Sequence, residues 1–234
     1  MNKLLVITGG TKGIGRAIIE RFAREGFHIA TCARNEKDLA ALETFIKETY
    51  PTTVFTMKAD VSKKEEVMRF VQAVKDKYDK VDVLVNNAGV FIPGTIHEEE
   101  EGALELMINT NLYSAYHMAR GFIHEMKAAR SGHIFNMCST ASIMPYANGG
   151  SYCISKFALL GMSKVLREEM KEQNVRVTSI LPGATLTASW EGVDLPEERF
   201  MKPGDVAESV WSAYQLSDRT VIEELVMRPQ LGDI

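Results

Sequence analysis

The stretch KLLVITGGTKGIG, residues 3–15, runs from a short apolar segment directly into a turn with three spaced glycines. Gly9, Gly13 and Gly15 have the spacing G-x-x-x-G-x-G. Glycines there let the chain turn tightly and bring its backbone close to a phosphate group, which the N-terminus of a following helix attracts. The stretch therefore predicts a strand, a turn and a helix that bind a dinucleotide; a plain strand-to-helix turn is the alternative. The residues of this turn expected to contact the cofactor are Gly9, Thr11, Lys12, Gly13, Ile14 and Gly15.

The rest of the chain alternates short β-branched runs with longer amphipathic segments, which favours a parallel sheet with helices on both faces. Predicted strands span residues 3–8, 27–33, 54–59, 81–87, 133–139, 175–182 and 222–229. Predicted helices span residues 14–25, 36–48, 63–78, 103–129 and 152–173. No internal repeat or linker marks a boundary, so we expect residues 1–234 to form a single α/β domain. We expect a doubly wound Rossmann fold with a seven-stranded parallel sheet, in which ligands bind beyond the carboxyl ends of the strands.

Composition limits the classes of partner. The chain has 234 residues and a formal net charge of -4, so we expect neither nucleic acid nor a membrane surface as partner. Only five apolar residues precede the first glycines, too few for a signal peptide, and we expect a cytoplasmic protein. Cys32, Cys138 and Cys153 lack paired spacing, which predicts buried small side chains, and we expect no metal site. The sequence motifs of serine hydrolases, P-loop nucleotidases and zinc proteases are missing.

The segment TCARN, residues 31–35, bears on the identity of the dinucleotide. An acidic residue in this region typically binds the ribose 2′-hydroxyl of NAD, whereas an arginine suits the 2′-phosphate of NADP. Arg34 and Asn35 stand there, and Lys12 could add a second positive charge to the same phosphate. Each cation alone could be a solvated surface residue. Together they favour NADP(H).

The segment SYCISKF, residues 151–157, places Tyr152 and Lys156 four residues apart at the start of a predicted helix. Side chains at this separation share one face of a helix. Alone, a phenol and an ammonium are poor proton carriers at neutral pH, but a nearby ammonium favours the phenolate form. The pair therefore indicates a general acid, provided that other residues complete the site.

Five features, in order along nearly the whole chain, resemble the short-chain dehydrogenase/reductase family. They are TGGTKGIG at 8–15, NNAG at 86–89, Asn111, Ser139 and Y-x-x-x-K at 152–156. The resemblance implies an NADP(H)-dependent enzyme that reduces a carbonyl to an alcohol by hydride transfer. It implies Tyr152 as the general acid and Ser139 as a hydrogen-bond donor to the carbonyl oxygen. It further implies that Lys156 holds the nicotinamide ribose and that Asn111 anchors a water linking Lys156 to solvent.

The same resemblance implies further cofactor contacts. Asp60 and Val61 correspond to a pair that binds the adenine, and Asn87, Ala88 and Gly89 to a turn beside the adenine ribose. A segment after the sixth predicted strand corresponds to one that binds the nicotinamide amide, through Pro182, Gly183, Thr185 and Thr187. Tyr152 and Lys156 also face the cofactor in this family. A homodimer or homotetramer formed through the long helices is the family expectation.

Substrate selection is expected in the irregular loop at about residues 184–202, with Trp190 as part of a lid. The alternative is a surface loop whose tryptophan packs down onto the protein. The lid hypothesis predicts an apolar substrate pocket that a flat aromatic molecule would fit. Its walls are expected to be Phe91, Met144, Tyr146 and Trp190.

Within the family, SGHIF at 131–135, YCISKF and the tail at 219–234 are most similar to bacterial sepiapterin reductases, which implies a pterin carbonyl as substrate. Asp233 in that tail is a hypothetical partner for the guanidine-like edge of a pterin. A broad alcohol dehydrogenase or 3-oxoacyl reductase is an alternative. A non-catalytic NADP(H) sensor is another. The acidic run HEEEEG, residues 97–102, is expected to be the solvated start of a helix.

Overall fold

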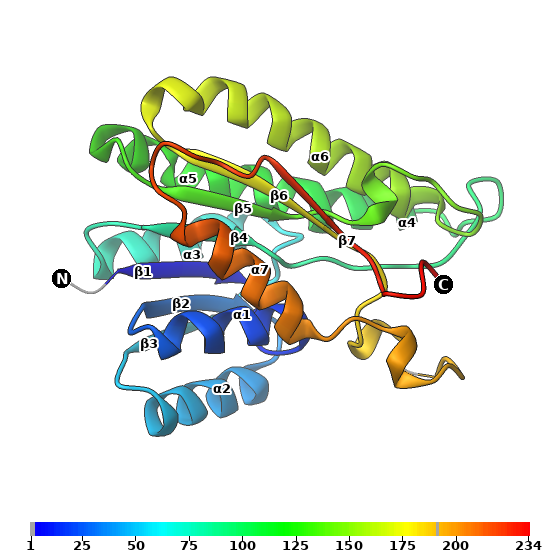
Figure 1. The fold of residues 1–234 in the computed structure, drawn as a ribbon, viewed down its shortest axis with the longest axis horizontal. Coiled ribbons are helices and arrows are strands. Elements are labelled where there is room, and N and C mark those ends of the chain that lie inside the picture. Colours follow the sequence, from blue (N-terminus) through cyan, green and yellow to red (C-terminus); the bar gives the residue numbers. More distant parts are fainter. Residues whose placement is uncertain (1–2, 191) are drawn as a thin grey trace.

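The computed structural model describes residues 3–190 and 192–234, and they form one sheet covered by helices on both faces (Figure 1). Seven parallel strands have the order β3-β2-β1-β4-β5-β6-β7. This confirms the predicted doubly wound fold, and the order of the strands reverses between β1 and β4. The strands are β1 Leu4–Thr8, β2 His28–Ala33, β3 Val54–Lys58, β4 Val83–Asn86, β5 His133–Met137, β6 Arg176–Pro182 and β7 Glu224–Met227.

The first strand shows why both faces of the sheet are covered. All residues of β1 are buried; Leu5 and Ile7 pack into one apolar cluster, whereas Leu4 and Val6 pack into a second. Successive side chains of a strand point to opposite faces, so a wholly apolar strand requires helices on each side. The first cluster packs against α1 Gly13–Arg24, α2 Glu36–Thr49 and α7 Pro203–Gln215. The second packs against α3 Lys64–Lys77, α5 Ser114–Ala129 and the end of α6 Gly150–Met170.

Two helical segments differ from the prediction. The helix α7 is missing from the predicted set, although it begins at Pro203, a residue favoured in the first turn. Its Trp211 packs on Phe22 of α1 and on Phe27, just before β2. The predicted helix at 103–129 is not uniform, because α4 Ala103–Met107 passes into a π-helix, Ile108–Tyr113, before α5 begins. A π-helix inserts an extra residue per turn, and no spacing of apolar residues announces it.

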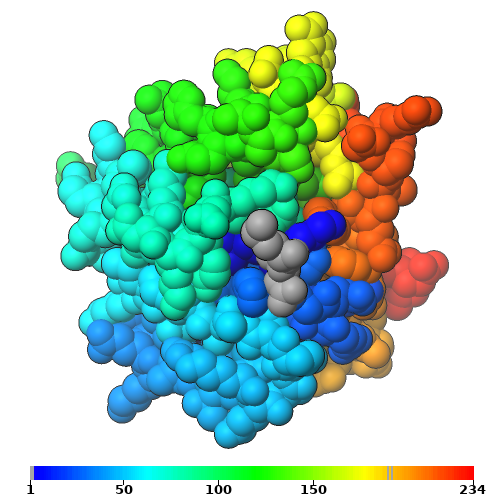
Figure 2. Space-filling view, turned by 90° about the vertical axis from the view of Figure 1, so that its left-hand side faces the viewer, coloured from blue at the N-terminus to red at the C-terminus, as the bar shows by residue number. Residues whose placement is uncertain are grey.

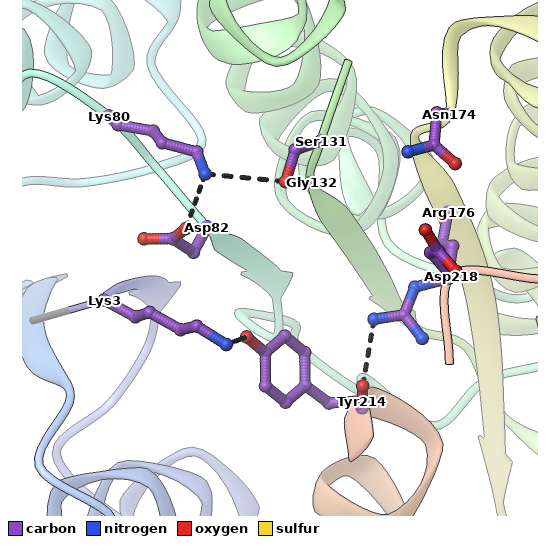
Figure 3. Close-up of a pocket in the computed structure, with 9 residues that line it drawn as sticks. All are labelled: Lys3, Lys80, Asp82, Ser131, Gly132, Asn174, Arg176, Tyr214 and Asp218. Carbon is purple, nitrogen blue, oxygen red and sulfur yellow. Dashed lines mark hydrogen bonds and ion pairs between the residues drawn. The ribbon is translucent and has the colours of Figure 1, made fainter. Parts of the chain in front are cut away.

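A polar pocket lies at the edge of the sheet where the strands begin (Figure 3). Several of its side chains bond to one another or to nearby backbone carbonyls. Lys3 donates to the hydroxyl of Tyr214 at 2.8 Å, Lys80 pairs with Asp82 at 2.9 Å, and Arg176 donates to the carbonyl oxygen of Tyr214 at 2.9 Å. Figure 2 shows this face, with the blue start of the chain beside the orange residues of α7. The contacts of Lys3 and Arg176 attach α7 to the sheet, at the edge opposite the one where ligands bind in doubly wound folds.

The described part of the chain lacks two kinds of feature. No helix in it has the length and apolar composition needed to cross a membrane. No group of three or more histidine, cysteine, aspartate or glutamate side chains in it could hold a metal ion. Cys32, Cys138 and Cys153 are free and buried, as predicted. Burial raises the pKa of Cys32 to about 12 and that of Cys138 to about 11, so these two thiols stay protonated at neutral pH.

One buried histidine makes stability depend on pH. His133 is fully buried at the start of β5, with its Nε2 2.8 Å from the hydroxyl of Thr178 and its ring stacked on Phe135. Burial, and then the charge of Arg176, hold the pKa of His133 well below its ordinary value. The unfolded chain, with an ordinary histidine of pKa about 6.5, therefore takes up a proton that the folded chain does not.

We expect the free energy of unfolding to fall below pH 6.5 as the pH is lowered toward the depressed pKa of His133. The contribution is about 1.4 kcal/mol per pH unit, because one proton separates the two states. Urea unfolding between pH 5 and pH 8 measures the slope. His133→Gln should lose this part of the slope, whereas His97→Gln, at an exposed position, should keep it. An unchanged slope in His133→Gln would show that His133 is not the group responsible.

Candidate active site

A cavity of about 450 Å³ opens where the carboxyl ends of the central strands meet, beside the point where the strand order reverses. The glycine turn contributes Ile14, and the candidate catalytic residues Ser139, Tyr152 and Lys156 lie in its wall. The four candidate substrate residues, which come from three separate loops, line it too: Phe91, Met144, Tyr146 and Trp190. The structure therefore brings together residues that are almost 180 positions apart in the sequence.

The turn after β1 has the backbone that its glycines predict. Gly9 and Gly13 adopt φ angles of 69° and 55°, in the left-handed region that favours glycine. A Cβ atom on Gly15 would lie only 2.5 Å from the side-chain nitrogen of Asn87. That nitrogen donates to the carbonyl oxygens of Thr8 and Gly9, each at 3.0 Å. The side chain of Asn87, just beyond β4, thus holds the turn after β1 in place.

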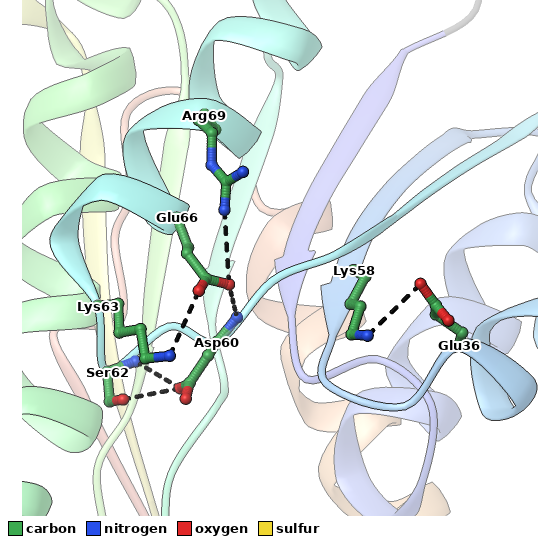
Figure 4. Close-up of polar contacts among 7 residues, drawn as sticks. All are labelled: Glu36, Lys58, Asp60, Ser62, Lys63, Glu66 and Arg69. Atoms are coloured by element: carbon green, nitrogen blue, oxygen red, sulfur yellow. Dashed lines mark hydrogen bonds and ion pairs between the residues drawn. The ribbon is translucent and has the colours of Figure 1, made fainter.

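The adenine end of the site, as inferred from the sequence, is a network of charged side chains beyond β2 and β3 (Figure 4). Asp60 accepts hydrogen bonds from the backbone and hydroxyl of Ser62 at 3.1 and 2.7 Å, and its own backbone N–H donates to Glu66 at 2.8 Å. Burial alone would raise the pKa of Asp60, but the two bonds from Ser62 and the charges of Lys63 and Arg34 lower it below its ordinary value. Asp60 is therefore ionised at neutral pH.

The three polar candidates nearest this network differ in what they contact. Arg34 is exposed beyond the end of β2. Asn35 caps α2, because its side-chain oxygen accepts from the backbone of Lys37 at 2.9 Å. Lys12 pairs with Asp38 at 3.0 Å, which neutralises part of its charge. Lys12 is thus held in an ion pair, whereas Arg34 is exposed to solvent and its charge acts on Asp60.

The helical residue Asn111 sits in the π-helix and is almost completely buried. Its oxygen accepts from the backbone N–H of Val90 at 2.7 Å, and its nitrogen donates to the carbonyl of Val90 at 3.0 Å and to the hydroxyl of Ser155 at 2.9 Å. A Cβ atom on Gly89 would lie 3.2 Å from this oxygen and 3.5 Å from Nζ of Lys156. Asn111 therefore joins the loop after β4 to the helix that carries Tyr152 and lies next to Lys156.

The Tyr152 and Lys156 pair is held by the end of β5 and by the loop after β4. Lys156 is buried and donates through Nζ to the carbonyl of Met137, at the end of β5, at 2.8 Å. Its Nζ lies 5.8 Å from the centre of the Tyr152 ring. Phe91 packs edge-on against that ring, with centroids 5.0 Å apart. Burial, and then the neighbouring Tyr152, raise the pKa of Tyr146 above its usual range, so Tyr146 faces the cavity as a neutral phenol.

Ser139 follows β5, bonds to the backbone of the segment after it, and lines the cavity. Its oxygen accepts from the backbone of Ala141 at 3.1 Å, and its backbone N–H donates to the hydroxyl of Ser142 at 3.1 Å. This capping box fixes the short 3₁₀ helix Thr140–Ser142. The hydroxyl also reaches the carbonyl of Pro182 at 3.5 Å. Ser139 is thus both the N-cap of this 3₁₀ helix and a polar group in the cavity wall.

The loop after β6 is tied at its base. The backbones of Ala184 and Leu186 bond to Met201, each at 2.9 Å. Between them Trp190 lines the cavity and packs on Phe200, with ring centroids 5.1 Å apart. Trp190 therefore combines the two alternatives, since it packs on the protein and also faces the cavity. The predicted irregular stretch also contains two 3₁₀ turns, Ala188–Trp190 and Glu197–Arg199.

Asp233 and the acidic run at 97–102 each contact other charged or polar side chains. Asp233 lies in the cavity wall, where its carboxylate pairs with Arg228 at 2.8 Å. The acidic run at 97–102 is not simply the solvated start of a helix, because α4 begins only at Ala103 and Glu99 binds Ser151 at the start of α6. Sequence reasoning missed Glu99, since its partner is 52 residues away.

Together, the fold and the cavity define a dinucleotide-binding protein of the oxidoreductase class. The short chain dehydrogenase family model matches residues 3–197, and the chain belongs to this family. It is 35% identical to the sepiapterin reductase of Chlorobaculum tepidum, over 100% of the chain and 99% of that protein. It is also 35% identical to a 3-oxoacyl-[acyl-carrier-protein] reductase of Chlamydia trachomatis, over 78% of the chain and 74% of that protein.

Solved structures that resemble this chain are also oxidoreductases. L-Sorbose reductase of Gluconobacter frateurii, complexed with NADPH and L-sorbose, has a TM-score of 0.91 and 29% identity, over 97% of this chain and 95% of that one. An alcohol dehydrogenase of Thermococcus sibiricus, complexed with 5-hydroxy-NADP, has a TM-score of 0.92 and 30% identity, over 98% and 97% of the two chains. The suspected family is thereby confirmed.

Proposed function

We propose that this protein is an NADPH-dependent carbonyl reductase whose general acid is Tyr152. The observation that carries the proposal is the convergence of Ser139, Tyr152 and Lys156 on the cavity that the glycine turn also lines. A protein that only bound NADP(H) as a sensor would have no need of these three residues in one cavity. A non-catalytic NADP(H) sensor is the second candidate function, and a failure to reduce any carbonyl would favour it.

The residues of the cavity suit the reduction of a carbonyl. When bound, NADPH supplies the hydride for the carbonyl carbon. The hydroxyl of Tyr152 donates its proton to the carbonyl oxygen, and Ser139 donates a hydrogen bond to the same oxygen as negative charge develops on it. The ammonium of Lys156, anchored on Met137, stabilises the phenolate that remains on Tyr152. Asn111 borders this group, on the route by which a proton from solvent restores the phenol.

The chain has the features of a cradle for NADP(H). Side chains on Gly9 or Gly13 would be strained by the left-handed backbone, so this turn leaves its backbone open to a pyrophosphate. Arg34, beyond β2, is proposed to bind the 2′-phosphate, and Asp60 to bind at the adenine. Relatives solved with NADP(H) cover nearly the whole chain, which supports the same cofactor here.

The substrate is proposed to be a pterin side-chain carbonyl, as in a sepiapterin reductase. Aromatic walls from Phe91, Tyr146 and Trp190 suit a flat ring, and the carboxylate of Asp233 suits its guanidine-like edge. The similarity to the Chlorobaculum tepidum enzyme supports this class. A 3-oxoacyl reductase or a broad alcohol dehydrogenase is the alternative within the family, since relatives of both kinds are similar to the chain.

The protein is also proposed to be a cytoplasmic homodimer or homotetramer. Apolar and aromatic side chains on the outer surface of α5 and α6 are exposed, among them Tyr116, Phe157 and Val165. A second copy of this chain could cover them. Light scattering during size-exclusion chromatography is expected to give at least twice the mass of 26.1 kDa, and a monomer at micromolar concentration would refute this.

Replacing the general acid gives a direct test of the mechanism. Tyr152→Phe should lower kcat about 10²- to 10⁴-fold, because the proton donor is lost while the ring is kept. Fluorescence titration should show NADPH binding within about twofold of the wild-type value. Tyr113→Phe is the matched control and should retain full activity, because Tyr113 is exposed at the end of the π-helix. Turnover by Tyr152→Phe at the wild-type rate would refute the proposed mechanism.

The substrate is tested by the initial rate of NADPH oxidation with sepiapterin, run beside a simple diketone and with NADH as cofactor control. We expect sepiapterin to react with NADPH and the rate with NADH to be much lower. Asp233→Asn should raise the KM for sepiapterin about tenfold and leave the KM for the diketone unchanged. An unchanged sepiapterin KM would remove Asp233 from the site. Reaction of the diketone alone would leave a carbonyl reductase with a different substrate.

A further inference from the structure

The helix that carries Tyr152 and Lys156 begins without a cap of its own. Its N-cap residue is Gly149, which has no side chain, and its first turn contains no acidic residue. The first backbone N–H groups of a helix need acceptors from elsewhere, and an acidic group is favoured there by the helix dipole. Glu99, from the loop between β4 and α4, supplies both the acceptor and the charge.

Both carboxylate oxygens of Glu99 bind Ser151, a residue that is almost completely buried. Oε1 accepts from the backbone N–H of Ser151 at 2.8 Å, and Oε2 accepts from its hydroxyl. Ser151 immediately precedes Tyr152. The carboxylate thus holds the Gly150–Ser151 peptide bond and the side chain of the residue just before the general acid.

The loop around Glu99 is built against the start of α6. The backbone of Gly94 donates to Asn148 and accepts from Gly150, each at 3.0 Å. A Cβ atom on Gly94 would lie 2.6 Å from Cγ of Glu99, and one on Gly150 would collide with its carboxylate. Glycine at both positions therefore leaves the space that the side chain of Glu99 occupies.

The first turn of α6 is consequently held from two sides. Glu99 holds Ser151, and one turn later Asn111 donates to the hydroxyl of Ser155, which itself donates to the carbonyl of Tyr152 at 2.8 Å. The loop that carries Glu99 also carries Phe91, which packs on the ring of Tyr152. The same loop therefore sets the backbone and the ring of the general acid.

We propose that Glu99 is a positioning residue for Tyr152, acting through Ser151 to fix the first turn of α6 so that the phenol meets the substrate carbonyl. The expected effect on catalysis rests on the proposed function. The attachment of the first turn by Glu99 rests only on the contacts with Ser151. An error in position of about 1 Å can cost about 100-fold in rate, so a loosened first turn should be visible in kcat.

The kinetic test compares Glu99→Ala and Glu99→Gln with Glu100→Gln, a neighbouring exposed glutamate, as the matched control. Glu99→Ala should lower kcat about 10- to 100-fold, with the Kd for NADPH within about twofold of the wild-type value. Glu99→Gln keeps one oxygen as acceptor and should fall between. Ser151→Ala removes the hydroxyl bond, so the double variant with Glu99→Ala should be no slower than Glu99→Ala alone. Wild-type kcat in Glu99→Ala would overturn the proposal.

Hydrogen exchange followed by mass spectrometry separates this proposal from the proposed function. Glu99→Ala should speed exchange in residues 149–157 and leave the central strands β1 and β4 unchanged, whereas Glu100→Gln should change neither. Faster exchange throughout the sheet would mean that Glu99 contributes only to overall stability, which would overturn the proposal. If the wild-type protein reduces no carbonyl, the proposed function fails, and exchange at 149–157 still decides whether Glu99 fixes the turn.

Discussion

The side chain of Asn87 holds the two strand ends between which the order of the sheet reverses. Its nitrogen donates to the carbonyls of Thr8 and Gly9, while the hydroxyl of Thr8 accepts from the backbone of Asn87 and Ala88. These bonds fix the glycine turn against β4, and the cavity opens beside them. The positions of α1 and of the cofactor cradle follow from this junction, because a turn with left-handed glycines has little rigidity of its own.

The residues proposed to be catalytic are held by parts of the chain that are far apart. Lys156 is anchored on β5 through Met137, and Ser155 on the π-helix through Asn111. Ser139 is fixed by its own capping box. Buried polar groups need hydrogen-bond partners, so these contacts satisfy the groups and orient them at the same time. The side chains proposed to act in catalysis therefore also have a structural role.

Much of the fold could be predicted because its signals are local. Runs such as KLLVIT and HIFNMCS contain the strands found as β1 and β5, and the glycine spacing anticipated the turn with positive φ angles at Gly9 and Gly13. The helix α7 was missed beside an irregular loop, although Pro203 marks its start. The π-helix around Asn111 was missed because no local sequence pattern distinguishes it from an ordinary helix.

The sequence by itself determined the class of this protein. Alternation of apolar runs, the glycine turn and the Tyr152–Lys156 spacing are short-range features that are readable without a structure. Only the tertiary structure decided how the charged residues are used. It paired Lys12 with Asp38 and joined Glu99 to Ser151 across 52 positions. Such pairings depend on which loops the packed sheet brings together, and this proximity in space has no counterpart in local sequence pattern.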